Sequence, residues 1–282
     1  MVATYVRSES ANGQWDMVVE SPDPRLRAHV REYEWWTETS PTPQRSRHVP
    51  FGNAVMIINL GPPLGVEYPA RGEDFGRLQA FFAGLHDGYA ITDSPGHSRG
   101  LQINLTPIGA RLFLDAPMSE LTNRAVELRE VIGPLAGRVA ERLHDAPTSQ
   151  ACFAILDDAI GARIAAARPV LPAVVWAWQQ IVSNHGCVSI GGLAGEIGWS
   201  RKHLTAQFRE HIGLPPKTLA RIHRFDRARR LLERAGTRRW AEIALRCGYY
   251  DQAHFIRDFS AFSGVTPRAF VRSLLPHGDT DA

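Results

Sequence analysis

Two stretches near the end of the chain are rich in side chains that donate hydrogen bonds or present small alkyl groups. They are basic, polar and small alkyl residues, namely Arg201, Lys202, Thr205, Ala206, Arg209, Gln252, Ala253, Ile256 and Arg257. Arginine and lysine donate hydrogen bonds to phosphates and to the O6 and N7 atoms of guanine, and glutamine can pair with adenine. The alkyl groups of Ala206 and Ile256 suit the methyl group of thymine. We predict that these residues contact DNA, with Lys202 and Arg257 reading bases and Arg201 or Arg209 holding phosphates.

These residues lie within an internal repeat. The first copy contains Leu193, Ala194, Ile197, Gly198, Trp199, His203, Leu204, Phe208, Gly213 and Pro216, and the second contains Ile243, Ala244, Cys247, Gly248, Tyr249, His254, Phe255, Phe259, Gly264 and Pro267. Because glycine readily adopts a left-handed conformation, Gly198 and Gly248 predict a turn after a short first helix. The four-residue spacing of Phe255 and Phe259 indicates the buried side of a second helix. This layout is that of a helix-turn-helix motif, which we expect at residues 190–211 and 240–262.

A basic segment, residues 219–234, connects the two copies. Its apolar residues recur at helical spacing, at Leu219, Ile222, Phe225, Ala228 and Leu232, and its arginines are Arg221, Arg224, Arg227, Arg229, Arg230 and Arg234. We expect these arginines to be mostly solvated or paired with Asp226 and Glu233, with a minority on phosphates. The net charge of +3 combines an acidic excess in residues 1–169 with a basic excess in residues 170–282. The second part therefore suits a polyanionic partner.

The pattern Gly248-Tyr249-x(4)-His254-Phe255-x(3)-Phe259-x(4)-Gly264-x-x-Pro267 resembles the signature of the AraC/XylS-type DNA-binding domain. The resemblance covers residues 174–275, and it departs at residues 250–253, where the family more often has Phe- or Ser-type residues around the cap. It implies two helix-turn-helix units joined by a long helix, with their second helices in successive major grooves about 34 Å apart. It also implies double-stranded DNA as a partner, with a small-molecule effector and RNA polymerase as further candidates.

The two copies are expected to contribute unequally to DNA binding. The first presents more long cationic donors than the second. In the second copy, Asp251 and Asp258 would repel phosphates unless Asp251 caps its helix. We therefore expect the first copy to hold more of the affinity and the second to discriminate through fewer contacts.

The first hundred residues are rich in candidate strands. Runs of valine, isoleucine and aromatic residues between glycine- and proline-containing turns predict strands at 15–20, 32–38, 53–60, 78–85, 89–92 and 101–105, and helical spacing follows at 108–114, 135–144 and 150–167. We expect an α+β chain, with an antiparallel β-sandwich or barrel and helices before an all-α part. The N-terminal half loosely resembles cupin-like regulatory domains, and residues 107–113 resemble a recurring bacterial version of them. We place a ligand-sensing and dimerisation domain at 1–168 and the DNA-binding domain at 169–282.

The N-terminal part also suggests a dimer interface and an effector pocket. Leu143, Phe153, Leu156 and Ile160 exceed what one sheet is expected to cover, so we expect a homodimer through helices within 135–167. The aromatic residues Trp35, Trp36, Phe51, Phe81 and Phe82 either line an effector pocket or, as is more common, form the sheet core. The effector-binding residues are not identified by the sequence.

Metal, redox and catalytic chemistry find little support. His29, His48, His86 and His97 show no His-x-His spacing, and Cys152, Cys187 and Cys247 are far apart, so we expect no metal site and no disulfide. His203 and His254 occupy matched positions, where packing or capping is expected before base contact, and Cys247 is expected to act as a small hydrophobic residue. No P-loop or Cys-x-x-Cys pattern occurs. We expect no cofactor, no catalytic residues and no enzymatic activity.

Three classes of function are compatible with these features. No run of about 18 apolar residues could cross a membrane, and the first residues lack a secretory pattern, so we expect a cytoplasmic protein. Our interpretation is a sequence-specific transcription regulator. The alternatives are a non-specific architectural DNA-binding protein and a small-molecule enzyme within residues 1–150 fused to a DNA-binding tail. Loss of Lys202 or Arg257 would weaken an architectural protein on all DNA, but would relax a regulator's preference at particular base pairs.

Overall fold

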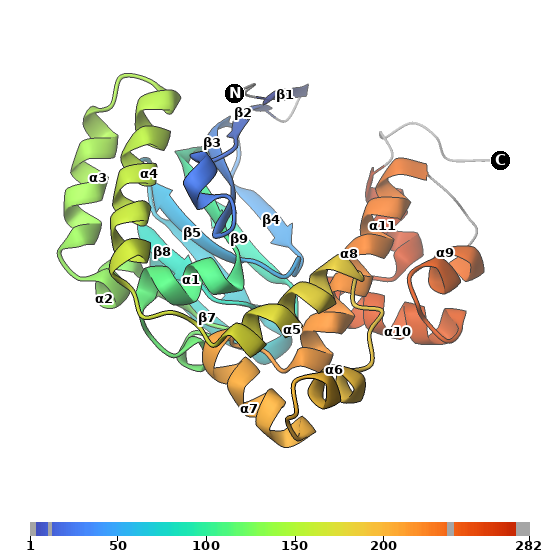
Figure 1. The fold of residues 1–282 in the computed structure, drawn as a ribbon. Coiled ribbons are helices and arrows are strands. Elements are labelled where there is room, and N and C mark those ends of the chain that lie inside the picture. Colours follow the sequence, from blue (N-terminus) through green and yellow to red (C-terminus); the bar gives the residue numbers. More distant parts are fainter. Residues whose placement is uncertain (1–3, 11–12, 236–239, 275–282) are drawn as a thin grey trace.

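The computed structural model describes residues 4–10, 13–235 and 240–274. Within them the first half of the chain forms two antiparallel sheets, with strand orders β1-β2-β3-β10-β5-β8-β11 and β4-β9-β6-β7 (Figure 1). The first sheet contains β1 (Thr4–Ser10), β2 (Gly13–Glu20), β3 (Val30–Thr39), β5 (Ala54–Asn59), β8 (Ala80–Ala83), β10 (His97–Leu105) and β11 (Ala125–Glu127). The second contains β4 (Gln44–His48), β6 (Leu64–Tyr68), β7 (Glu73–Leu78) and β9 (Ala90–Ser94). The expected antiparallel β-rich first half is confirmed.

Helices α1 (Pro107–Leu114), α2 (Leu128–Ile132), α3 (Leu135–Asp145) and α4 (Ser149–Ala166) pack against the first sheet on the side away from the second sheet. The side chain of Thr106 caps α1 by accepting a hydrogen bond from the Gly109 amide at 3.0 Å. Gly109 also lies directly against the backbone, since a Cβ atom there would be 2.1 Å from the His29 carbonyl oxygen. This close approach fixes α1 against the chain that enters β3.

Strand β3 supplies both the helical side and the inner side of the sandwich, because side chains alternate along a strand. Tyr33 points toward the helices, where its hydroxyl donates to Asp157 at 2.7 Å and its ring stacks on Phe153. Glu34 and Trp36 have the opposite orientation and line the space between the two sheets. One strand therefore joins the helical core to the interior of the sandwich.

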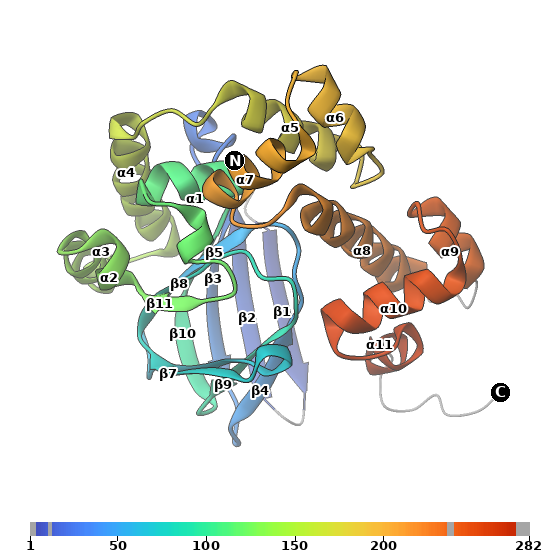
Figure 2. The same ribbon diagram turned by 90° about the horizontal axis from the view of Figure 1, so that it is seen from below.

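The second half is helical and comprises α5 (Pro172–Ser183), α6 (Ile190–Glu196), α7 (Arg201–His211), α8 (Pro216–Ala235), α9 (Trp240–Arg246), α10 (Gln252–Ser263) and α11 (Pro267–Leu274). Figure 2 shows α8 running from the group α5–α7 to the group α9–α11. The expected all-α part with two helix-turn-helix units and a long connecting helix is confirmed. In the described part of the chain, no helix is both long and apolar enough to span a bilayer.

The two halves of the chain share a continuous hydrophobic core that extends from the first sheet to α10. Helix α7 packs against α1 and the 3-10 turn Met118–Glu120, and the Thr122 hydroxyl donates to the Gly213 carbonyl at 2.8 Å. On the other side, Arg47 donates to the Ser263 carbonyl at 3.0 Å. The N-terminal half therefore contacts both helix-turn-helix units, the first through α1 and the turn that follows it and the second through β4.

Several strands were not predicted, and most of them belong to the second sheet or to sheet edges. Strand β4 has the sequence Gln-Arg-Ser-Arg-His and contains no apolar residue, so a search for apolar runs passes over it. Strand β7 is also largely exposed, and its only apolar side chains are Phe75 and the buried Leu78. These strands are defined by backbone pairing with a neighbour, which their own side chains do not reveal.

The premise for a dimer through α3 and α4 is wrong. Leu143, Phe153, Leu156 and Ile160 are between 0% and 3% exposed within the single chain. The two helices pack on each other and α4 packs on α1, so the chain itself covers their apolar sides. These residues are not available to a second copy.

Replacing Gly109 with alanine tests the close contact under α1. We expect Gly109→Ala to lower the free energy of unfolding by about 1–3 kcal/mol, because the added methyl group meets backbone that cannot move aside easily. As a control, Gly137→Ala lies in α3 with open space around it and should raise stability by up to about 1 kcal/mol. Urea unfolding followed by circular dichroism measures both. An unchanged midpoint for Gly109→Ala would contradict the packing described here.

Candidate nucleic-acid interface

Helices α6 and α7 form the first helix-turn-helix unit. Gly198 between them has a φ of +71°, which is the left-handed conformation that the turn requires. The Ser200 side chain caps α7 by accepting from the His203 amide at 3.1 Å. Leu204 and Phe208 are fully buried, so the predicted buried side of α7 is confirmed.

Helices α9 and α10 repeat this construction. Gly248 has a φ of +74°, and the Asp251 carboxylate caps α10 by accepting from the His254 amide at 2.6 Å. Phe255 and Phe259 are fully buried, as Leu204 and Phe208 are in α7. The internal repeat of the sequence is therefore a repeat of structure.

The matched histidines pack against the aromatic residue that follows each turn glycine. The ring of His203 lies edge-on to Trp199, with centroids 4.5 Å apart, and that of His254 lies edge-on to Tyr249 at 5.2 Å. The expected packing role is confirmed. Cys247, which directly follows α9, is fully buried, and burial raises the pKa of its thiol to about 11, so it behaves as a small hydrophobic residue.

The predicted DNA-contact residues lie mainly on the exposed sides of α7 and α10. The exposed ones are Arg201, Lys202, Ala206, Arg209, Gln252, Ala253 and Arg257. Thr205 is half-buried and its hydroxyl donates to the Arg201 carbonyl at 2.8 Å, and Ile256 is half-buried against the core. The structure thus gathers one set on each second helix, and their contact with DNA stays a prediction.

Asp258 does not face the exterior, and the expectation that it would repel phosphates is wrong. It is 5% exposed, and its carboxylate accepts from Arg221 of α8, with Nη2 at 2.8 Å from Oδ1 and Nε at 3.2 Å from Oδ2. This ion pair raises the pKa of the Arg221 guanidinium, which also lies over the Phe262 ring. The pair attaches α10 to α8.

Other arginines of α8 are also paired, as expected. The buried Asp226 carboxylate holds Arg229 at 2.6 Å and Arg230 at 2.9 Å, and Arg229 reaches Glu233 at 2.6 Å. Arg224 instead lies over the Tyr249 ring and donates to a backbone carbonyl. Much of the basic charge of α8 therefore stabilises the domain itself.

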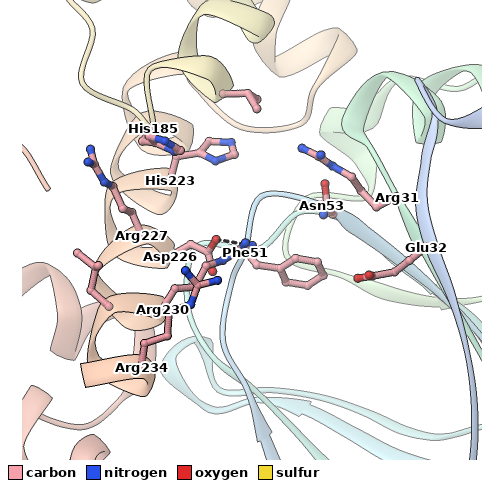
Figure 3. A pocket seen from close by; sticks show the side chains of 12 residues that line it. Arg31, Glu32, Phe51, Asn53, His185, His223, Asp226, Arg227, Arg230 and Arg234 are labelled. Carbon is pink, nitrogen blue, oxygen red and sulfur yellow. Dashed lines mark ion pairs between the residues drawn. The ribbon is translucent and has the colours of Figure 1, made fainter. Parts of the chain in front are cut away.

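A cleft of about 710 Å³ separates α8 from the first half of the chain. Arg227, Arg230 and Arg234 of α8 line one side of it, and Arg31, Glu32, Phe51 and Asn53 of the first half line the other (Figure 3). Burial lowers the pKa of His223 to about 4, so its ring is neutral near pH 7. The positive charge of this cleft therefore comes from arginines.

A second cavity, of about 310 Å³, lies between the two sheets. Trp36, Phe51 and Phe81 line it, whereas Phe82 belongs to the helical-side core and Trp35 packs against that core. Trp36, Phe51 and Phe81 therefore line a pocket, whereas Phe82 forms part of the sheet core and Trp35 packs against it.

The polar residues of this cavity were missed by the sequence reasoning. Glu34 and Glu38 line it, together with His86, whose ring stacks on Tyr68. A signal was available, because Glu34, Trp36 and Glu38 occur at every second position of a predicted strand and must share one face. An acidic row on the inner face of a strand is unusual, since buried carboxylates require partners.

Residues 96–100 read Gly-His-Ser-Arg-Gly, a Gly-x-Ser-x-Gly spacing that hydrolases use for a nucleophilic serine. In those enzymes the serine lies at a sharp turn between a strand and a helix. Ser98 instead lies within β10, where it donates to Glu38 at 3.0 Å and accepts from the Trp36 indole at 3.2 Å. Its surroundings are those of a structural hydroxyl.

The loop between β4 and β5 connects the cavity to α8. Phe51 lines both the cavity and the cleft. The next residue, Gly52, packs so closely on α8 that a Cβ atom there would be 2.9 Å from the His223 ring. This loop therefore contacts both the cavity and α8.

Both parts of the chain match known sequence families. Residues 193–273 match the model of a helix-turn-helix domain, and residues 19–127 match a domain of unknown function (DUF6597). The F1 operon positive regulatory protein of Yersinia pestis is 37% identical over 83 residues, which are 29% of this chain and 27% of that protein. The chain therefore matches only about a quarter of this relative's length.

Comparisons with solved structures give further similarities. ToxT from Vibrio cholerae aligns over 96% of this chain and 100% of its own, with a TM-score of 0.47 and 10% identity. The C-terminal domain of AraT, a response regulator from Geobacillus stearothermophilus, aligns over 40% of this chain and 95% of its own, with a TM-score of 0.36 and 25% identity.

The sequence match at residues 193–273 coincides with the two structural units and their connecting helix. Each unit has its glycine turn, its capped second helix and its buried aromatic or aliphatic side. The C-terminal part of this chain is therefore a helix-turn-helix domain of the AraC/XylS type.

Proposed function

We propose that the protein is a sequence-specific DNA-binding transcription regulator whose N-terminal part binds a small effector. The observation that carries the proposal is the placement of two helix-turn-helix units at the ends of one helix. Helix α8 has 20 residues, which corresponds to about 30 Å. Successive major grooves on one face of DNA are about 34 Å apart. The length of α8 therefore suits simultaneous insertion of α7 and α10.

Within this proposal, Lys202 of α7 and Arg257 of α10 read base edges, while Arg201 and Arg209 hold phosphates. Repulsion of phosphates by Asp251 and Asp258 is no longer a reason to expect weaker DNA binding by the second unit, because Asp251 caps α10 and Asp258 is paired with Arg221. The number of exposed cations still favours the first unit. A non-specific architectural role is the competing function, and the base-pair preferences of variants separate the two.

The effector would act through the cavity between the sheets. Phe51 borders this cavity and the cleft beside α8, and Gly52 contacts His223. A ligand that moved Phe51 would shift the balance between orientations of α8 by the difference in its affinity for them. This contact supports regulation of the DNA-binding units from the N-terminal part.

We place the domain boundary between residues 168 and 169, in the segment that separates α4 from α5. A homodimer and contact with RNA polymerase belong to the proposal, as does a cytoplasmic location. With α3 and α4 covered, support for a dimer comes from edge strand β1, where Tyr5 is 74% and Val6 38% exposed.

Alanine substitution of the proposed base-reading residues tests sequence-specific binding. A preferred site is first selected from random DNA, and Lys202→Ala and Arg257→Ala are then titrated against every single-base-pair change of it. Each variant should cost about 1–3 kcal/mol on the preferred site and relax preference at one or two positions. The positions affected by the two variants should be about 10 base pairs apart.

The matched control is Arg129→Ala, which removes an exposed arginine from α2 and should leave binding unchanged. A uniform loss of affinity across the library would reassign the residue concerned to phosphate contact. Uniform loss for both variants would favour the architectural function.

The ion pair between α8 and α10 should be needed for the second unit to discriminate bases. We expect Asp258→Asn to lower the free energy of unfolding by about 1–3 kcal/mol, since Arg221 loses its charged hydrogen-bond acceptor. It should also reduce base preference in the half-site of α10 more than in that of α7. Chemical unfolding and the same DNA library measure these effects, with the exposed Asp158→Asn as control. Equal effects on both half-sites would contradict a local role.

A further inference from the structure

We propose that the cavity between the two sheets binds a small aromatic amine, with its ammonium group against Glu34 and its ring against Trp36. The inference deepens the proposed function and rests on it, since it names the chemical class of the effector. The cavity has a volume of about 310 Å³, which suits a small ligand with one ring system. It lies at the lower end of the roughly 300–1,000 Å³ typical of ligand pockets.

The walls of the cavity favour a flat ring. Trp15, Trp36, Phe51, Tyr68 and Phe81 all line it. Aromatic side chains pack on ligand rings in stacked or edge-on arrangements, and their faces attract cations. This combination suits a ligand that is both aromatic and positively charged.

Glu34 supplies an acceptor that the protein itself does not use fully. Asn104 donates to its Oε1 atom at 2.6 Å and Gln102 donates to the same atom at 3.3 Å. Among the described residues these hydrogen bonds all end on Oε1, which leaves Oε2 for a ligand. No arginine or lysine occurs among the described residues that line the cavity. Burial without such a partner raises the pKa of Glu34 to about 7.

The other ionisable residues of the cavity do not favour an anion. Glu38 also lines it and accepts from Ser98 at 3.0 Å. Burial lowers the pKa of His86, so this ring does not supply a cation near neutral pH. A ligand carboxylate would face two glutamates in a partly desolvated space, which is unfavourable. An ammonium group would instead complete the missing pair.

The spacing along β3 fits an arylalkylamine. Glu34 and Trp36 are two residues apart on the same face, which is about 6.6 Å along a strand. This suits a ring that carries its ammonium group on a short alkyl chain. The Trp36 ring is held in place, since its indole donates to Ser98 at 3.2 Å and a Cβ atom at Gly100 would lie 2.6 Å from the ring.

A matched series of ligands tests the inference on the full chain without DNA. Tryptamine, tryptophol and indole-3-propionate share one ring system and carry an ammonium, a hydroxyl and a carboxylate group. In isothermal titration calorimetry, tryptamine should bind at least about tenfold more tightly than either of the others. Glu34→Gln, which keeps the size and an acceptor oxygen, should weaken tryptamine about tenfold and leave tryptophol unchanged.

Glu32→Gln is the matched control. Glu32 lies on the same strand and accepts from the same Asn104 at 3.1 Å, but it lines the cleft and not the cavity. This variant should bind tryptamine as the unchanged protein does. Thermal unfolding checks that each variant folds, and if Glu34→Gln does not, the ligand series on the unchanged protein decides.

Three outcomes would overturn the inference: no tryptamine binding at millimolar concentration, equal or tighter binding of the alcohol or the acid, or unchanged tryptamine affinity in a folded Glu34→Gln variant. DNA binding is measured separately on the selected site. Loss of amine binding with intact site-specific DNA binding would refute the ligand class and leave the proposed regulator standing. Amine binding without site-specific DNA binding would refute the DNA-binding function alone.

Discussion

The burial of one side of helix α8 between the two helix-turn-helix units holds the C-terminal half together. Leu219, Ile222, Phe225, Ala228 and Leu232 are each 0% or 1% exposed. Helices α5 and α7 pack on this helix, and so do α9, α10 and α11. A rigid helix with both units buried against it fixes their separation and angle, which flexible linkers could not do. The exposed sides of α7 and α10 are positioned by this arrangement.

Charge in the C-terminal half serves two purposes that the structure separates. Asp226 and Asp258 are buried acids of the described region. Asp226 pairs with Arg229 and Arg230 within α8, and Asp258 of α10 pairs with Arg221 of α8. Lys202, Arg209 and Arg257 lie on exposed faces. Removing a partner from the first group leaves charge in a partly buried place, so those residues bear on folding. The second group can be changed with little effect on the fold, which makes it suitable for tests of DNA recognition.

Side chains of strand β3 reach helix α4, the cavity between the sheets and the cleft beside α8. Tyr33 reaches Asp157 of α4, Glu34 and Trp36 face the cavity, and Arg31 lines the cleft beside α8. The loop that carries Phe51 forms a second route from the cavity to the same helix. Packed side chains thus connect the cavity to α8, the helix that joins the two helix-turn-helix units, and such a connection is the physical condition for coupling between them.

The helix-turn-helix units were determined by local sequence, because glycine turns, N-cap residues and a four-residue apolar spacing act within a few residues of each other. Phe255 and Phe259 could be placed inside, and Gln252 and Arg257 outside, from spacing alone. The N-terminal strands that contain apolar runs could likewise be predicted from local sequence. Strand β4 could not be predicted in this way, because its residues are polar and it forms a strand by pairing with β9. The partner of Asp258 is Arg221, a residue distant in sequence, so local patterns could not show that Asp258 is paired and does not face DNA. In the same way, only the folded chain shows that Leu156 is covered by its own core and not by a second chain. The cavity around Glu34 was likewise decided by tertiary structure, since its walls come from strands of both sheets that only folding brings together.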